Sequence, residues 1–92
     1  MSNYVILEDS YKMAKLLKLD IKTSKNINKK IDVYKDGLFI FSIGNIKYLD
    51  YSHYIKNHSL DYANNRRKLY YKRNKLSHDI NSRKYISAKI LW

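Results

Sequence analysis

The sequence predicts a small α+β domain, in which a β-hairpin or three-stranded meander over about residues 31–48 is packed by short helices. An Asp-Gly turn between two apolar strands and a helical spacing of apolar side chains near both ends indicate this fold class. A chain of 92 residues favours one domain with a modest core. We therefore expect a single domain over 1–92, divided into an N-terminal arm and helix (1–22), a linker (23–30), and a hairpin with a basic helical segment (31–92).

The N-terminal third carries one predicted helix. Residues 4–7 are apolar and indicate a strand or an extended arm. Glu8-Asp9-Ser10 offers an N-cap and negative charge, both of which favour the start of a helix. Apolar side chains then recur at helical spacing with lysines opposite, which predicts an amphipathic helix over about 10–19. Residues 22–30 are mostly polar, which predicts the linker.

The hairpin is the clearest local signal. Ile31–Lys35 and Leu38–Ile43 flank Asp36-Gly37, a dipeptide that suits the two left-handed positions of a tight hairpin turn. The second arm is apolar on both faces, so we expect it to be covered on both sides. Gly44-Asn45 predicts a second turn, with a short third strand at 46–48.

Three further helices are expected, over about 52–57, 59–76 and 82–91, with Ser52, Ser59 and Ser82 as the capping residues. On the helix at 59–76, Tyr62, Leu69 and Leu76 repeat every seven residues, and Ala63 and Tyr70 form an adjacent row. Trp92 is expected to pack in a core or an interface, because its side chain buries about 200 Å².

Positive charge is concentrated in the last third of the chain. The net charge is +11, which favours a polyanionic partner. All four arginines lie there, and six cations fall between Arg66 and Lys75 with no acid among them. On a helix, Arg66 and Arg73 follow one line, and the lysines 68, 72 and 75 follow another.

This pattern predicts a helix face that binds phosphates, since each neutralised phosphate releases counterions and Arg binds phosphate oxygens in a bidentate manner. The alternative is a solvated lysine-rich face with tyrosines in the core. Tyr71 and Tyr85 are further tyrosines that could stack on bases, and Asn64, Asn65 and Asn74 could read base edges, but Asn is frequent throughout the chain. We therefore expect largely sequence-independent contacts from Arg66, Arg67, Lys68, Tyr70, Lys72, Arg73, Lys75, Arg83 and Lys84.

The sequence gives little support for an enzyme. Cysteine is absent, which excludes disulfides, thiol catalysis and cysteine zinc sites. The chain has no HExxH, GxSxG or glycine-rich phosphate loop. A small nuclease would have His53 or His58 as its base. We expect a protein without catalytic activity, metal or cofactor.

The sequence also predicts no membrane partner and no secretory signal peptide. Its longest apolar runs have four residues, whereas a membrane-spanning helix needs about 20. The N-terminus lacks the basic and apolar regions of a signal peptide.

Residues 29–92 carry motif pieces of a known group. They are Asp32-Val33-Tyr34 with Gly37, Ile43-Gly44, Asp50-Tyr51, Arg66-Arg67-x-x-Tyr70-x-x-Arg73 and Leu91-Trp92. With these pieces the chain resembles a group of short basic proteins, of unknown function, encoded by large DNA viruses and some tailed phages. The resemblance implies a viral or phage origin, and a location in the virion or in the cytoplasm of the infected host cell. It implies no mechanism.

Two functions follow as hypotheses. The first is a non-enzymatic nucleic-acid-binding protein, with DNA favoured over RNA, associated with a viral or phage genome or particle. The alternative is a minor structural protein of a capsid or virion, whose basic face binds acidic protein surfaces while Tyr4–Leu7 and Trp92 serve as anchors. The kind of strand, the oligomeric state and the protein partner stay open.

Overall fold

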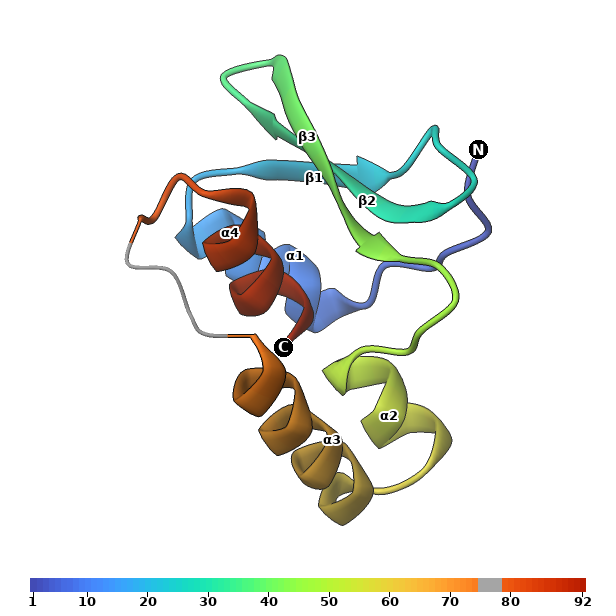
Figure 1. The fold of residues 1–92 in the computed structure, drawn as a ribbon. Coiled ribbons are helices and arrows are strands. Elements are labelled where there is room, and N and C mark those ends of the chain that lie inside the picture. The colour runs from blue at the N-terminus through green and yellow to red at the C-terminus, as the bar shows by residue number, and fades with distance from the viewer. Residues whose placement is uncertain (75–78) are drawn as a thin grey trace. The chain divides into compact units, whose positions relative to one another are not determined.

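The computed structural model describes residues 1–74 and 79–92, and its elements confirm the α+β class (Figure 1). Three antiparallel strands form a meander in the order β1-β2-β3. The chain divides into two compact units, Met1–Tyr48 and Leu49–Trp92, so the single domain stays a prediction. The elements are α1 (Glu8–Leu16), β1 (Asp20–Thr23), β2 (Lys29–Lys35), β3 (Leu38–Asn45), α2 (Tyr51–Asn57), α3 (Leu60–Arg73) and α4 (Arg83–Leu91).

Helix α1 begins and ends earlier than predicted. Its N-cap is Leu7, which makes no side-chain capping bond, so the predicted cap within Glu8-Asp9-Ser10 is wrong. The acidic residues of that segment instead occupy the first turn, where the helix dipole favours negative charge. The helix stops because Lys18 adopts φ 59°, in the left-handed region. The N–H groups of Lys18 and Leu19 then bond the carbonyls of Lys15 and Ala14, which is a Schellman motif.

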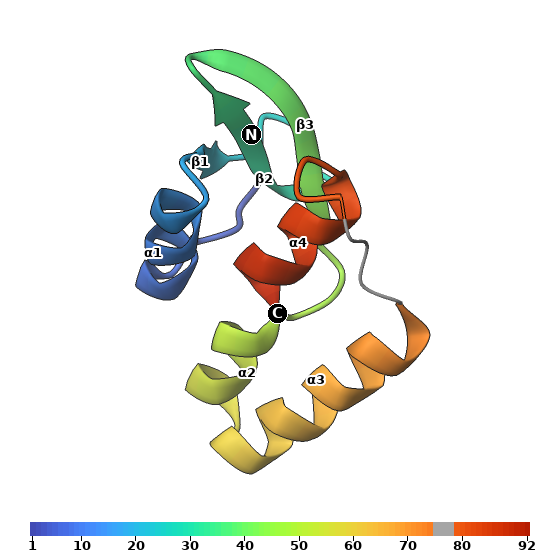
Figure 2. The same ribbon diagram turned by 90° about the vertical axis from the view of Figure 1, so that its left-hand side faces the viewer.

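The predicted linker at 23–30 is wrong, because its ends belong to strands. Strand β1 pairs with β2, with Ile21 opposite Val33 and Thr23 opposite Ile31. Figures 1 and 2 both show α1 beside β1. The residues before α1 form an extended arm rather than a strand, and the Tyr4 carbonyl accepts a bond from the Thr23 hydroxyl at 3.2 Å.

The hairpin prediction is confirmed. Asp36 and Gly37 have φ values of 52° and 80°, as a tight turn between right-twisted strands requires. The predicted third strand at 46–48 is wrong. Those residues turn instead, with the Tyr48 N–H bonded to the Asn45 carbonyl.

The expectation that β3 is covered on both sides is also wrong. Ile31, Val33 and Ile43 are fully buried in the sheet, but Leu38 and Phe39 are 73% and 58% exposed. Strand β1 begins opposite Tyr34, so the turn end of the hairpin is only two strands wide. The hairpin extends beyond β1 at that end (Figure 1).

One buried carboxylate joins three segments of the meander. Asp32 accepts bonds from the hydroxyls of Ser24 and Ser42, each at 2.6 Å, and from the Lys25 N–H at 3.0 Å. Burial alone would raise the pKa of Asp32, but these bonds and the Lys25 charge outweigh it, so the pKa lies below its ordinary value. Asp32 therefore stays ionised and fixes the β1–β2 turn to β3.

The described part of the second unit contains three helices. Helix α2 is capped by Asp50, which accepts the His53 N–H, rather than by Ser52 as predicted. The predicted caps Ser59 of α3 and Ser82 of α4 are confirmed, since each accepts the N–H three residues on. Helix α3 ends at Arg73, and the predicted extension at 75–76 lies outside the described residues.

Aromatic side chains gather within this second unit. Trp92 stacks on Tyr70, with ring centroids 4.6 Å apart and planes 10° apart, and it also meets Tyr54 at 6.0 Å. Tyr54 meets Tyr62 at 5.6 Å. The C-terminal end of α4, α2 and α3 therefore share one aromatic cluster, which agrees with the expected packing of Trp92.

Candidate nucleic-acid interface

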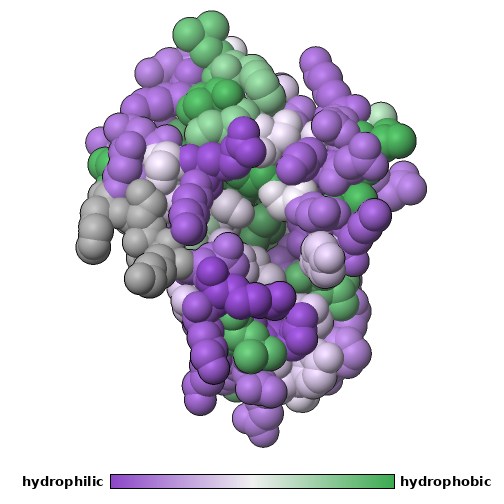
Figure 3. All heavy atoms as spheres, in the orientation of Figure 1, coloured by the Kyte–Doolittle hydropathy of each residue, from purple (hydrophilic) through white to green (hydrophobic). Residues whose placement is uncertain are grey.

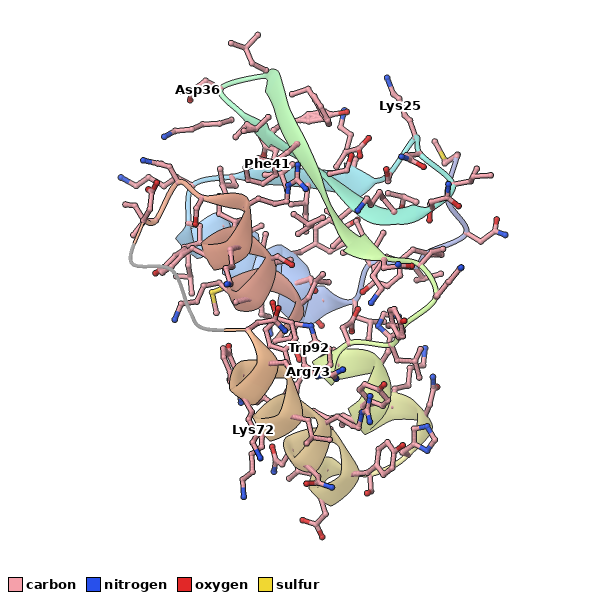
Figure 4. All side chains as sticks on the ribbon, viewed as in Figure 1. Lys25, Asp36, Phe41, Lys72, Arg73 and Trp92 are labelled. Atoms are coloured by element: carbon pink, nitrogen blue, oxygen red, sulfur yellow. The ribbon has the colours of Figure 1, made fainter. Side chains whose placement is uncertain are left out.

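Helix α3 has one packed face and one solvent face. Ala63 is fully buried and Tyr70 half-buried, so the predicted row of Ala63 and Tyr70 faces inward. Tyr62 and Leu69, in the seven-residue row, are instead 44% and 39% exposed. Lys68 and Lys72, at the helix spacing of four residues, are exposed, and Figure 4 shows Lys72 pointing away from α2.

Two tyrosines of α2 pack against the inner side of α3. The Tyr51 hydroxyl donates to Asn64 Oδ1 at 2.8 Å. The guanidinium of Arg67 lies 4.6 Å from the centroid of the Tyr51 ring, and that of Arg66 lies 5.6 Å from the Tyr54 ring. These distances are those of cation–π contacts, so the arginine pair attaches α3 to α2. Asn64, a candidate base reader, is engaged within the protein.

Arg66 and Arg67 differ in how far their N–H groups are available to a ligand. Arg66 is half-buried, and its Nε is buried with no hydrogen-bond partner among the described residues. Arg67 is exposed, although its ring contact fixes the guanidinium plane. Because stacking uses the face of a guanidinium, the in-plane N–H groups of Arg67 can still donate to an anion.

The exposed cations of α3 have no acidic partner. Within residues 1–74 and 79–92, ion pairs such as Lys12 with Glu8 and His53 with Asp50 form elsewhere, and no residue of α3 takes part in one. Asp61 in the first turn is the only acid on the helix. The structure thus leaves four exposed, unneutralised cations on α3, which are Arg67, Lys68, Lys72 and Arg73. Figure 3 shows mainly hydrophilic side chains over this helix.

Tyr70 occupies a different position from the other predicted site residues. One face of its ring is stacked on Trp92, and Tyr71 meets it edge-on at 5.3 Å. Burial raises the pKa of Tyr70, a hydrogen bond with Ser87 opposes that rise, and Tyr71 adds to it. The structure therefore places Tyr70 in the aromatic cluster, which corresponds to the alternative expectation that the tyrosines lie in the core.

The remaining predicted cations lie apart from α3. Arg83 and Lys84 are exposed in the first turn of α4, on a different helix from the other predicted cations. Lys75 lies outside the described residues. The structure thus places five of the predicted cations on α3, four of them exposed, and leaves two on α4.

The histidines considered for a nuclease have other surroundings. His53 Nδ1 lies 2.8 Å from Asp50 Oδ1, the same oxygen that caps α2. His58 lies against Tyr62, with ring centroids 4.5 Å apart. Among the residues that the structure describes, no group of three or more histidine and carboxylate side chains is placed to hold a metal ion.

Sequence reasoning missed the role of Tyr51 and Tyr54. They stand at positions 1 and 4 of α2 and so lie on neighbouring positions of one helix face. The sequence did contain a signal for this packing, because Tyr51 and Tyr54, three residues apart, are followed along the chain by the Arg66-Arg67 pair. It became meaningful only once α2 and α3 were known to pack together.

No protein-family model, curated protein or solved structure matches this chain. The likeness to short basic proteins of large DNA viruses and tailed phages stays a prediction from its motif residues. Several of those residues hold the fold, since Asp32 joins the meander, Asp50 caps α2 and Trp92 stacks on Tyr70. None of the described helices combines the length and hydrophobicity of a membrane span.

Proposed function

We propose that this protein binds nucleic acid without sequence specificity, through the solvent face of α3, and that it associates with a viral or phage genome or particle. One observation carries the proposal: Arg67, Lys68, Lys72 and Arg73 are exposed on a single helix and have no carboxylate partner among the described residues. Cations that are grouped on one helix without acidic partners attract a polyanion and release its counterions on binding.

The packing of α3 supports this function. A helix that is fixed to its neighbour presents its cations at constant spacing, so binding a phosphate backbone orders fewer side chains. Lys68 and Lys72 lie about one turn apart, about 6 Å along the helix axis, so their two charges are presented side by side. The tyrosines of α2 supply the rigidity and leave the cations free for the ligand.

The first turn of α4 adds a second argument. The helix dipole makes this end partially positive, so a cation there destabilises the helix by about 0.3–1 kcal/mol. Arg83 and Lys84 both stand in that turn, which contains no acid. Charges in a position that disfavours folding are better explained by an anionic partner than by stability.

The test compares two triple variants that remove equal charge. One is Lys68→Ala/Lys72→Ala/Arg73→Ala on α3. The control is Lys12→Ala/Lys15→Ala/Lys22→Ala, three exposed lysines of the other unit. Binding of fluorescent duplex DNA, with single-stranded DNA and RNA as further probes, is measured by anisotropy between about 50 and 200 mM salt.

Six phosphate contacts predict that the wild type loses about a thousandfold in affinity over that range, and three contacts predict about fortyfold for the α3 variant. The control should keep the wild-type slope. Equal slopes for both variants would mean that net charge acts without α3. Absence of salt-dependent binding by the wild type would sink the proposal and favour an acidic protein surface as the partner.

A further inference from the structure

Strand β3 is the open edge of the meander. The strand order β1-β2-β3 leaves it with a neighbour on one side only. No backbone hydrogen bond of the described residues reaches Leu38–Gly44 from any segment other than β2. An edge of this kind presents a row of N–H and C=O groups at which another strand can add.

Strand β3 lacks most of the usual protections of an edge strand. Natural edges carry lysine, proline or inward-pointing charge. Leu38–Asn45 reads LFIFSIGN and contains no charged residue and no proline. A bulge, which is a further protection of natural edges, is present where Val33 pairs with Phe41 and Tyr34 with Phe39, but Leu38, Phe39 and Ile40 stay exposed. Figure 3 shows hydrophobic side chains gathered at this end of the hairpin.

We propose that β3 is a self-association edge, at which a second copy of this chain adds antiparallel to its own β3. A strand paired with its own copy about a two-fold axis is self-complementary, which gives a closed dimer. The result is a six-stranded sheet across the two copies, with the apolar ends of both hairpins covered in part.

The distribution of charge favours a second copy of this chain as the partner of β3. Two chains of net charge +11 repel each other over most of their surfaces, but β3 is neutral. Antiparallel pairing about the middle of β3 brings the turn that contains Asp36 beside the other copy's turn that contains Lys47, so opposite charges meet at both ends. Figure 4 shows Asp36 at the hairpin turn, clear of the sheet.

Salt should act in opposite directions on self-association through β3 and on nucleic-acid binding through α3. Screening weakens the repulsion between two cationic copies, so self-association should strengthen as salt rises. Binding of nucleic acid through α3 should weaken over the same range. Failure of one proposal is therefore distinguishable from failure of the other.

The test uses sedimentation equilibrium on the full chain without nucleic acid, from about 1 µM to about 1 mM protein, which spans moderate and weak dissociation constants. The decisive variant is Leu38→Lys on β3. Its matched control is Leu16→Lys on α1, because the two leucines are 73% and 76% exposed and both changes add one positive charge. Circular dichroism verifies that each variant folds as the wild type does.

We expect a monomer–dimer equilibrium for the wild type, a dissociation constant raised at least about tenfold by Leu38→Lys, and a change within about twofold for Leu16→Lys. Amide hydrogen exchange should show new protection in β3 as protein concentration rises. A monomeric wild type at all concentrations, equal weakening by both leucine changes, or a dimer without β3 protection would each overturn the proposal.

Discussion

The indole of Trp92 lies nearly parallel to the Tyr70 ring, at 10° and 4.6 Å between centroids, and this stack joins the end of α4 to α3. Parallel-displaced aromatic pairs contribute about 0.5–1.5 kcal/mol beyond the burial of their area. The basic helix thus has aromatic partners on both α2 and the end of α4.

Trp92→Ala should therefore lower the free energy of unfolding by about 2–4 kcal/mol, since the side chain is half-buried and not fully buried. Trp92→Phe should lose much less, because a smaller ring keeps the stack. Urea unfolding followed by circular dichroism measures both. A loss below about 0.5 kcal/mol for Trp92→Ala would show that the stack contributes little to folding.

Asp32→Asn should destabilise the protein by about 1–3 kcal/mol at neutral pH, because an amide cannot accept the Lys25 N–H and both hydroxyls as the carboxylate does. The pKa of Asp32 is lowered in the folded protein from 3.8, so its contribution is complete above 3.8 and is lost as pH falls through the lower folded value.

The difference between wild type and Asp32→Asn should consequently be constant near neutral pH and shrink below about pH 4. Urea unfolding at a series of pH values measures this difference. Asp20→Asn, at an exposed position of β1, is the control and should change stability by less than about 0.5 kcal/mol. A difference that grows in acid would contradict the assignment of Asp32 as an ionised acceptor.

Lys18→Gly should stabilise the protein by about 0.5–1 kcal/mol. Lys18 adopts φ 59° in the Schellman motif after α1, and glycine reaches this region without the steric cost of a Cβ. The same change at Lys15, inside the helix, should destabilise by about 1 kcal/mol. Thermal unfolding of the pair measures both signs, and a destabilising Lys18→Gly would contradict this account of the helix end.

Arg67→Lys should separate the two roles of the α3 arginines. The charge is retained but the planar stack on Tyr51 is lost, so stability should fall by about 0.5–1 kcal/mol while the salt slope of DNA binding is unchanged. Lys68→Ala should do the reverse, with unchanged stability and a slope lower by about 0.9. If both variants moved both quantities alike, the division of α3 into a packed and a binding side would be wrong.

Some local signals were read correctly from the sequence, whereas the caps expected within residues 8–10 and at Ser52 were wrong. The Asp36-Gly37 turn and the Ser59 and Ser82 caps depend on a few adjacent residues, and the structure confirms all of them. Strand β1 was missed because only Ile21 is apolar in it, and its strand conformation depends on pairing with β2. For the same reason the sequence could not show that Arg66 is packed and Arg73 is exposed, since the position of α2 decides which arginine is packed.

The hydrogen bonds of Asp32 span only 8, 7 and 10 residues along the chain. Contacts between near neighbours in sequence close small loops and form early, whereas distant contacts wait for larger loops to close. The meander thus has the low contact order of a region that forms in the folding transition state. Removing the Asp32 carboxylate would then slow folding more than it speeds unfolding, which a chevron plot of Asp32→Asn would show as a φ-value nearer one than zero.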